Sequence, residues 1–381
     1  MRTLMNSATL SSLALLLASC GSAATGESPA VTATLAEGHA VEELARFDSP
    51  WAIALLPGDT EALVTERTGK LKLWREGGEI RDVTGVPQVD AGGQGGLGDV
   101  VLAPDFATSG MVYLTWAEAG EGDTRGAAMG RARLVREGKP RLEGLQVIWR
   151  QVPKVTGRGH FAHRIAFSSD GRYLFLSSGD RQKMAPAQDL SNTLGKVLRL
   201  LPDGSPAPGN PFADRTGPSA EIWSYGHRNV LGLQFDAAGR LWALEHGPKG
   251  GDELKLGRAG GNYGWPLVSD SDHYDGRPIP RNTTRPDLAA PAISWNPVIA
   301  PGDFLFYSGK AEAAWRGQAI IAGLVSQGLV RVAIDGGQAR EVARIPLDAR
   351  VRDVAEDANG NLWILTDRED GRLLRLTPRK K

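Results

Sequence analysis

A short unit that recurs six times constrains the fold of this 381-residue sequence more than any other feature. Each copy is a turn rich in Asp, Asn or Gly, followed at once by a hydrophobic segment and a polar break. The hydrophobic segments are 62–65, 111–114, 173–176, 241–244, 319–322 and 362–365, of which 319–322 is the weakest copy. Asp-Gly and Asn-Gly pairs suit tight hairpins because those turns need positive φ. The repeat predicts an all-β, six-bladed propeller of four-stranded antiparallel blades; a β-sandwich would explain the strands but not the repeat.

The composition excludes several other classes of protein. No long stretch with helical periodicity interrupts the strands. Lys plus Arg and Asp plus Glu both number 44, so no net charge favours nucleic acid or an acidic membrane surface as a partner. The single cysteine, Cys20, leaves no pair for a disulfide, so stability must come from a buried core.

The first twenty residues have the pattern of an export signal. A basic start at Met1-Arg2 precedes an apolar run too short to span a bilayer. The run ends in Leu-Ala-Ser-Cys, which resembles a bacterial lipobox with Cys20 as the lipidated residue; a plain periplasmic protein is the alternative. We expect a signal at 1–20, a flexible tether at 21–40 and one propeller domain at 41–381. We expect the mature protein in the periplasm, lipid-anchored to the outer membrane.

Four segments are richer in glycine and polar residues than blade packing requires; they are 92–99, 157–164, 224–229 and 245–253. The second segment holds two of the six histidines, His160 and His163. Histidine is well suited to proton transfer near neutral pH. In an extended segment, residues three apart point to opposite faces, so these two are not expected to act together. A hydrogen-bonded structural histidine remains the alternative reading.

The other segments also carry candidate ligands. Arg228 beside Asn229 could bind a planar, oxygen-rich ligand, or Arg228 could form a surface salt bridge. The segment 245–253 enters a tight Gly/Pro turn with carboxylates beyond it, which suits a hard cation or a plain surface turn. Arg350 and Arg352 alternate and so share one face of a strand, which predicts an anionic partner, either a ligand or a neighbouring aspartate, Asp348 or Asp353.

Taken in order, these segments resemble the soluble PQQ-dependent glucose and aldose sugar dehydrogenases. The resemblance extends from about residue 44 to residue 377 and is closer to the compact bacterial aldose sugar dehydrogenases. The motifs that carry it are Ser-Pro-Trp-Ala at 49–52, Thr-Glu-Arg-Thr-Gly at 65–69, Gly-Gln-Gly-Gly-Leu at 93–97, Ala-Pro-Asp-Phe at 103–106, Gly-Lys-Val-Leu-Arg at 195–199, Gly-His-Arg-Asn at 226–229, Glu-His-Gly-Pro at 245–248 and Asn-Tyr-Gly-Trp-Pro at 262–266.

The resemblance implies a chemistry for the site. His160 matches the general base that takes the proton from the anomeric hydroxyl, while hydride passes from C1 of the sugar to the quinone. Arg228 matches the residue that stabilises negative charge on the quinone oxygen. Asn229 is implied to be a neighbouring polar contact of the cofactor. Gln94 matches a position near both cofactor and sugar.

The resemblance also implies how the cofactors are held. Arg350 and Arg352 match the pair that engages the carboxylates of pyrroloquinoline quinone (PQQ). Gly247 and Pro248 match carbonyl ligands of a catalytic calcium ion, which acts on the quinone as a Lewis acid. Glu253 and Tyr263 match a second, structural calcium site.

Three positions depart from the family pattern. Gly159 stands where the glucose-specific branch has an acidic residue, which bears on sugar preference. Ser326 is aligned with a lysine that binds the cofactor, so one cationic contact is missing. Ala162 replaces a frequent glycine.

We therefore expect PQQ- and calcium-dependent oxidation of aldose mono- and disaccharides at C1 to lactones, with broad specificity. An external acceptor, a cytochrome or the quinone pool, must reoxidise the cofactor. Two other functions remain open: a calcium-dependent lactonase on a propeller, and a non-enzymatic carbohydrate-binding propeller.

Overall fold

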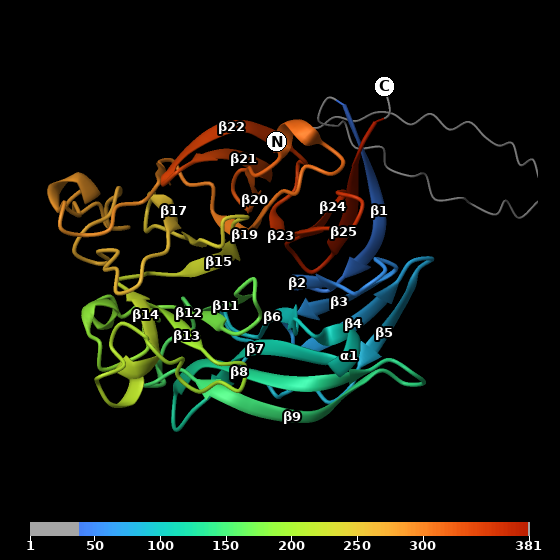
Figure 1. Ribbon diagram of the computed structural model, residues 1–381, viewed down its shortest axis with the longest axis horizontal. Helices are drawn as coiled ribbons and strands as arrows, with labels where there is room; N and C mark the ends of the chain where they lie inside the picture. The colour runs from blue at the N-terminus through green and yellow to red at the C-terminus, as the bar shows by residue number, and fades with distance from the viewer. Residues whose placement is uncertain (1–37, 380–381) are drawn as a thin grey trace, which may run out of the picture. The chain divides into compact units, whose positions relative to one another are not determined.

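The computed structural model describes residues 38–379, and these form six β-sheets arranged as blades around a central axis (Figure 1). One strand of each blade lies innermost and contacts the inner strands of the two neighbouring blades, so that β23 and β2 close the ring. The inner strands are β2 (Pro50–Leu55), β6 (Leu97–Leu102), β11 (Ala162–Phe167), β15 (Val230–Phe235), β19 (Pro301–Phe306) and β23 (Val351–Glu356).

The six sequence repeats all fall on the second strand of a blade. These strands are β3 (Glu61–Glu66), β7 (Met111–Ala119), β12 (Leu174–Ser178), β16 (Leu241–Glu245), β20 (Ala319–Gly323) and β24 (Leu362–Thr366). Each pairs with its inner strand and with a third strand in antiparallel fashion. The prediction of an all-β, six-bladed propeller is therefore confirmed.

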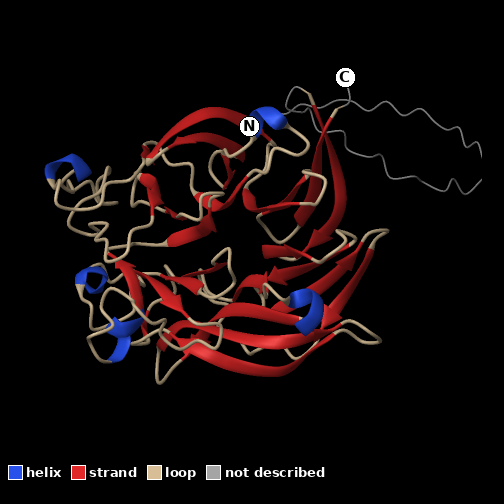
Figure 2. Ribbon diagram, in the orientation of Figure 1, coloured by secondary structure: helices blue, strands red, loops and turns tan. Residues whose placement is uncertain are grey.

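The outer strands complete the blades (Figure 2). The third strands are β4 (Lys70–Arg75), β8 (Thr124–Val135), β13 (Lys196–Leu200), β17 (Asp252–Leu256), β21 (Gly328–Asp335) and β25 (Gly371–Pro378). The fourth strands are β5 (Glu79–Val83), β9 (Arg141–Arg150), β14 (Ile222–Tyr225), β18 (Ile293–Trp295), β22 (Gln338–Pro346) and β1 (His39–Phe47). The second blade departs from the predicted four strands, because β10 (Val155–Thr156) also pairs with β8.

Helices are short and lie in the loops (Figure 2). They are α1 (Phe106–Ser109) and the 3-10 turns η1 (Ala185–Gln188), η2 (Gly217–Glu221), η3 (Asn282–Thr284) and η4 (Ala313–Trp315). Within the described residues, no helix has the length and hydropathy needed to cross a bilayer.

The two ends of the described chain close the ring of blades. β1 pairs antiparallel with β25, from His39 opposite Pro378 to Phe47 opposite Gly371. The first strand of the described residues, β1, is thus the outermost strand of the last blade. Because β1 begins at His39, the propeller starts slightly before the expected end of the tether at residue 40. Cys20 and the predicted signal lie outside the described residues.

The turn aspartates of the repeat explain why these hairpins form. Asp236 accepts hydrogen bonds from the amides of Ala238 and Arg240 and from the indole of Trp242, the last at 2.9 Å. Asp357 repeats the arrangement in the last blade, with Trp363 Nε1 at 3.1 Å. One carboxylate therefore fixes the turn and orients a buried tryptophan that packs between blades.

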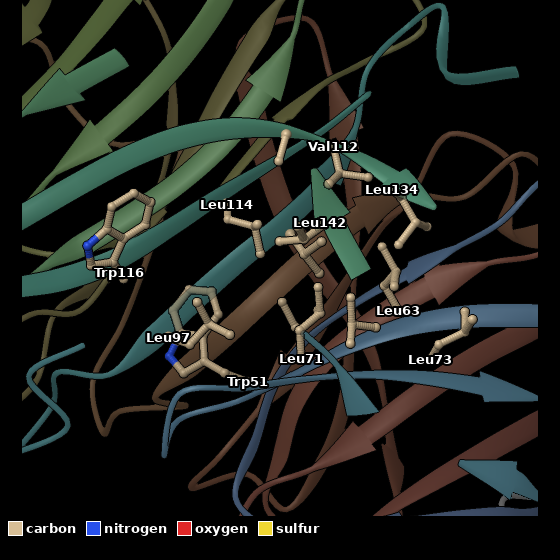
Figure 3. Close-up of a cluster of buried hydrophobic side chains, with 14 of the residues drawn as sticks. Trp51, Leu63, Leu71, Leu73, Leu97, Val112, Leu114, Trp116, Leu134 and Leu142 are labelled. Atoms are coloured by element: carbon tan, nitrogen blue, oxygen red, sulfur yellow. The ribbon is translucent and has the colours of Figure 1, made fainter. Parts of the chain in front are cut away.

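The hydrophobic core lies between adjacent blades. The cluster between the first two blades contains Trp51, Leu63, Leu97, Leu114 and Trp116, whose side chains converge in Figure 3, and none of them is more than 5% exposed. Burying one such side chain stabilises the fold by roughly 1.5–3 kcal/mol. The cluster joins β2, β3, β6 and β7, so it holds neighbouring blades at a fixed angle.

A single buried arginine ties the inner strands together. Arg164 on β11 is 2% exposed and contacts the inner strands of all five other blades. Its partners are Asp99 at 3.2 Å, Asp303 and Asp353 at 3.5 Å, the carbonyls of Leu231 at 2.8 Å and Gly302 at 3.0 Å, and the ring of Trp51 at 4.0 Å. This charged centre joins the inner strands of all six blades.

Candidate active site

A cavity of about 380 Å³ lies at one mouth of the channel, and every blade contributes to its wall. Its lining residues are Trp51, Arg67, Gln94, Phe161, Ala162, His163, Asn229, Leu231, His246, Ala300, Leu324, Val325, Arg350, Arg352 and Asp367. They sit where inner strands begin and second strands end. Antiparallel pairing brings those two ends to the same side of every blade, so loops far apart in sequence meet here.

His160 lies beside the cavity on a strained segment. Its φ is +49°, and Ala162 and His163 also have positive φ. Positive φ in residues other than glycine is costly and persists only where the surroundings enforce it. Arg181 supplies part of that support, because its Nε donates to the carbonyl of Gly159 at 2.9 Å and its guanidinium covers the ring of Phe161 at 3.8 Å.

A buried carboxylate orients the imidazole of His160. Nδ1 of His160 lies 2.6 Å from Oδ1 of Asp180, which is fully buried. Asp180 also accepts a hydrogen bond from the amide of Gln182 on Oδ1, and from the indole of Trp265 on Oδ2, both at 2.8 Å. An acceptor at Nδ1 keeps the proton on that nitrogen and leaves Nε2 as the basic atom. Burial and the charge of Arg228 lower the pKa of His160 against the opposing effect of Asp180, so the imidazole is neutral and ready to accept a proton.

Gln94 and Asn229 line the cavity and also fix the backbone of this histidine segment. Oε1 of Gln94 accepts the amide of His160 at 2.7 Å, and Oδ1 of Asn229 accepts the amide of Ala162 at 3.1 Å. Their oxygens are thus engaged by the chain. The amide NH₂ groups are the parts of these side chains left to donate toward a ligand.

Arg228 carries a donor that the chain does not use. Its Nη1 donates to the carbonyl of His246 at 3.1 Å, and its Nη2 donates to the hydroxyl of Tyr274 at 3.3 Å. Its Nε is buried and has no hydrogen-bond partner within residues 38–379. The guanidinium also lies 5.4 Å from the ring centroid of Trp265. Trp265 is buried, whereas Tyr274 is 72% exposed. A buried, unsatisfied donor costs free energy unless a ligand completes it.

Arg350 and Arg352 meet as the alternation predicted, and their neutralising residue is Asp367. Oδ2 of Asp367 accepts from Nε of Arg350 at 3.0 Å, and Oδ1 accepts from Nη2 of Arg352 at 3.0 Å. Neither aspartate named from the sequence fills this position, since Asp353 belongs to the Arg164 centre. Two guanidiniums share one carboxylate, so this end of the cavity keeps a positive charge.

The turn after β20 contributes no cation to the cavity. Leu324 and Val325 line the wall, whereas the hydroxyl of Ser326 is buried and is not part of it. No lysine is among the lining residues. The loss of a cationic contact at Ser326 stays a prediction.

The turn that begins at Gly247 presents free carbonyl groups. The carboxylate of Asp252 fixes it by accepting the amides of Gly247 at 3.0 Å and Ala300 at 2.7 Å. A side chain at position 247 would come within 1.9 Å of the carbonyl of Gly250, so the turn requires glycine. Across residues 38–379, no hydrogen bond to the carbonyls of Gly247 or Pro248 is formed. Backbone carbonyls of this kind fit a hard cation such as Ca²⁺.

Glu253 and Tyr263 do not form an open second metal site. The carboxylate of Glu253 already receives Nζ of Lys255 at 2.7 Å and Nδ2 of Asn282 at 2.8 Å. The hydroxyl of Tyr263 contacts the carbonyl of Leu256 and accepts the amide of Arg258 at 2.9 Å. These residues do not fit a second calcium, because a cation of the chain itself stands in its place. In the described part of the chain, no three His, Cys, Asp or Glu side chains converge on a possible metal position.

His163 has a separate, structural environment. Its Nδ1 lies 2.9 Å from the hydroxyl of Thr115, and its ring stacks on Trp51 at 5.1 Å. Burial, assisted by the charge of Arg164, lowers the pKa of His163 to about 3. The expectation that the two histidines do not act together agrees with these contacts.

Sequence reasoning missed four residues at the site: Asp180, Asp367, Trp265 and Tyr274. The two aspartates had a usable signal, since each lies within two residues of the end of a second strand, β12 or β24, on the side of the blade that faces the cavity. Trp265 lies in a motif that was recognised, but its contact with Asp180 spans 85 positions. Nothing in the sequence marks Tyr274 as a partner of Arg228.

This chain is similar to known proteins in both sequence and fold. Residues 47–375 match the family model described as glucose/sorbosone dehydrogenase. The aldose sugar dehydrogenase YliI of Escherichia coli is 37% identical over 342 residues, which cover 88% of this chain and 91% of that protein. The apo crystal structure of the soluble E. coli aldose sugar dehydrogenase superposes with a TM-score of 0.85 at 36% identity, covering 90% and 100% of the two chains. The PQQ-bound aldose sugar dehydrogenase of Streptomyces coelicolor gives a TM-score of 0.74 at 28% identity, covering 91% and 100%.

Proposed function

Because this chain belongs to the glucose/sorbosone dehydrogenase family, we propose that it is a PQQ- and calcium-dependent oxidoreductase that converts aldoses to lactones at C1. The observation that carries the proposal is the composition of the cavity. A basic pair, Arg350 and Arg352, stands at the wall, and a histidine–aspartate pair stands beside it.

The cavity has the size and donors that a planar tricarboxylate requires. Its volume of about 380 Å³ falls within the usual range for sites of small ligands. Arg350 and Arg352 would pair with carboxylates of the ligand. Guanidinium–carboxylate contacts are strongest when they are bidentate. The unused Nε of Arg228 would meet an oxygen of the ring system. The carbonyls of Gly247 and Pro248 would hold the calcium ion.

His160 is the proposed general base. Its free Nε2 takes the proton of the anomeric hydroxyl, while the C1–H bond breaks and its electron pair leaves with the hydrogen for the acceptor. The carbonyl of the lactone forms from the same oxygen. Asp180 stabilises the imidazolium that results, because its carboxylate is already 2.6 Å from Nδ1. Arg228 stabilises negative charge on the acceptor oxygen.

The bound quinone would supply the two-electron acceptor, and calcium would polarise its reacting carbonyl. Everything else in the step is positioning. The strained segment 160–163 fixes the base, and Gln94 and Asn229 fix that segment.

Broad sugar specificity is part of the proposal. Gly159 leaves no acidic side chain before His160. A side chain there would come within 2.4 Å of Gln182, which occupies the space. A neutral amide at this place selects less strongly among sugar hydroxyls than a carboxylate would.

The calcium-dependent lactonase alternative has less support. It requires side-chain oxygens converging on a metal in the channel. The three channel aspartates instead surround Arg164.

We also propose that the protein is exported, lipidated at Cys20 and anchored to the outer membrane from the periplasm. Electrons would then pass to a cytochrome or to the quinone pool. The sequence around Cys20 supports this proposal. Metabolic labelling with a tagged fatty acid tests lipidation. The wild type should be labelled and a Cys20→Ala variant should not; equal labelling of the two proteins would reject lipidation at Cys20.

Reconstitution tests the function. Apo-protein receives calcium, PQQ, both or neither, and oxidation of glucose, maltose and lactose is followed with an artificial electron acceptor. Turnover of several sugars only when both are present supports the proposal. Turnover without PQQ, or none in any of the four samples, would reject it.

A further inference from the structure

Two buried glutamates face each other across a strand pair behind the cavity. In the register of β16 and β17, Glu245 stands directly opposite Glu253. They are 2% and 6% exposed. Like charges at directly opposed positions destabilise a sheet, and more so when water is excluded. The fold therefore needs a cation at this point.

The chain supplies that cation from its own sequence. Lys255 lies two residues after Glu253 and so shares its face of β17. Its ammonium is 2.7 Å from Oε2 of Glu253 and also contacts Oε1 of Glu245. The side chain is 2% exposed, and Nζ lies 5.4 Å from the ring of Tyr263. One buried ammonium thus bridges two buried carboxylates over an aromatic ring.

The same network continues to the active-site segment. Oε2 of Glu245 accepts the backbone amide of Arg228 at 2.7 Å and that of Asn229 at 3.3 Å. Its Oε1 faces Nδ1 of His227 at 3.4 Å. The position of Glu245 therefore sets the position of the proposed catalytic arginine.

We propose that the ammonium of Lys255 replaces a structural metal ion between Glu245 and Glu253 and, through Glu245, positions Arg228. A calcium ion here would bring two positive charges into contact with the ammonium, so the two exclude each other. This inference goes beyond the proposed function, whose calcium ion is held by the separate turn at Gly247 and Pro248.

Removing the ammonium should create a metal site. Without it, Glu245 and Glu253 offer carboxylate oxygens in a confined space, and the amide of Asn282 lies beside Glu253. Oxygen donors of this type suit Ca²⁺. A Lys255→Asn variant adds one more amide oxygen and shortens the side chain.

The experiment compares the calcium content and thermal stability of the wild type, Lys255→Asn and Lys255→Gln. Each protein is dialysed against calcium, its bound metal is measured by mass spectrometry, and its Tm is recorded with and without a chelator. The wild type should hold one calcium ion per chain. Lys255→Asn should hold one more than the wild type. In chelator, its Tm should fall by about 5–10 °C relative to the wild type, because an uncompensated pair of buried charges is left. Added calcium should restore both Tm and turnover.

Lys72→Asn is the matched control. Lys72 also bridges two carboxylates, Glu66 at 3.6 Å and Asp82 at 2.6 Å, but on β4, where one partner is exposed. It should gain no metal, and calcium should not restore any loss of stability.

Two results would overturn the inference: two calcium ions in the wild type, or variants at position 255 with wild-type metal content and a Tm indifferent to calcium. If Lys255→Asn does not fold even with calcium, the inference is tested by the calcium content and Tm of Lys255→Gln together with the calcium content of the wild type. A wild type that binds no calcium would reject the calcium site at Gly247 and Pro248. It would not contradict the role proposed for Lys255, so the two proposals are rejected by different results.

Discussion

Replacing Asp180 by asparagine tests the orientation of the general base. Asp180 receives four donors: Nδ1 of His160 and the amide of Gln182 on one oxygen, and the indole of Trp265 and the amide of Met184 on the other. An asparagine has a single accepting oxygen. If that oxygen faces His160, its NH₂ group confronts two donors, the indole and the amide of Met184. If the group is flipped, only the amide of Gln182 confronts NH₂, because His160 can move its own proton to Nε2.

The flipped orientation therefore leaves fewer unsatisfied donors and should prevail. It protonates Nε2, the atom proposed to accept the proton from the sugar. The expected loss in kcat is the whole contribution of a general base, about 10²–10⁴-fold. Backbone contacts of the histidine segment come from Gln94 and Asn229, so cofactor binding should change little.

The assay is steady-state turnover of the reconstituted variant, with quinone absorbance measured after desalting to establish that the cofactor is bound. Asp170→Asn is the matched control, since Asp170 is exposed, lies in the same blade and pairs with Arg172. A kcat of Asp180→Asn within threefold of the wild type, with cofactor bound, would refute this account of the base.

Other substitutions and conditions test the rest of the site. Arg352→Gln should weaken PQQ binding about 10–100-fold in an equilibrium titration, because one charge-assisted hydrogen bond is lost; unchanged affinity would place the carboxylates elsewhere. Burial and Arg228 hold the pKa of His160 below its usual 6.5 despite Asp180. Since the neutral imidazole is the reactive form, kcat/KM should stay level as pH falls to 6.5 and decrease only at lower pH; a decrease that begins above pH 7 would argue against His160. Arg164→Met should lower the free energy of unfolding in urea by about 3–5 kcal/mol, because it leaves buried aspartates without their counter-charge. Arg172→Met, at an exposed position, is its control and should have little effect.

The repeat made the fold predictable from the sequence. Each copy couples a turn residue to the strand that follows it, and this is local information. Asp357, for example, lies six positions from the tryptophan that it binds. The closing pair of β1 with β25 joins the two ends of the described chain. No local pattern encodes that contact, so the sequence alone does not show where the tether ends and β1 begins.

The candidate site was predictable only in part. His160, Arg228 and the pair Arg350 and Arg352 stand in motifs whose residue types already indicate their chemistry. Their partners come from other loops. Asp180 is 20 positions from His160, and Asp367 is 15 and 17 positions from the two arginines. Such pairs form because antiparallel blades bring strand ends together, so they become visible only when the register is known.

Lys255 illustrates the same limit from the opposite direction. A family resemblance assigns a role to each matching residue separately, and in this way Glu253 and Tyr263 matched a metal site. The residue that changes the meaning of that match lies two positions away on the same face of β17. Charge at a buried site is a property of all the groups that meet there, so one added ammonium alters what the matched residues can bind.

A single-turnover experiment tests the central claim most directly. The enzyme, loaded with calcium and PQQ, is mixed with one equivalent of glucose in the absence of any electron acceptor, and quinone absorbance and lactone are measured together. The account predicts reduction of the cofactor with formation of one gluconolactone per quinone reduced. Cofactor that stays oxidised, or that is reduced without lactone, would contradict oxidation at C1 by this site.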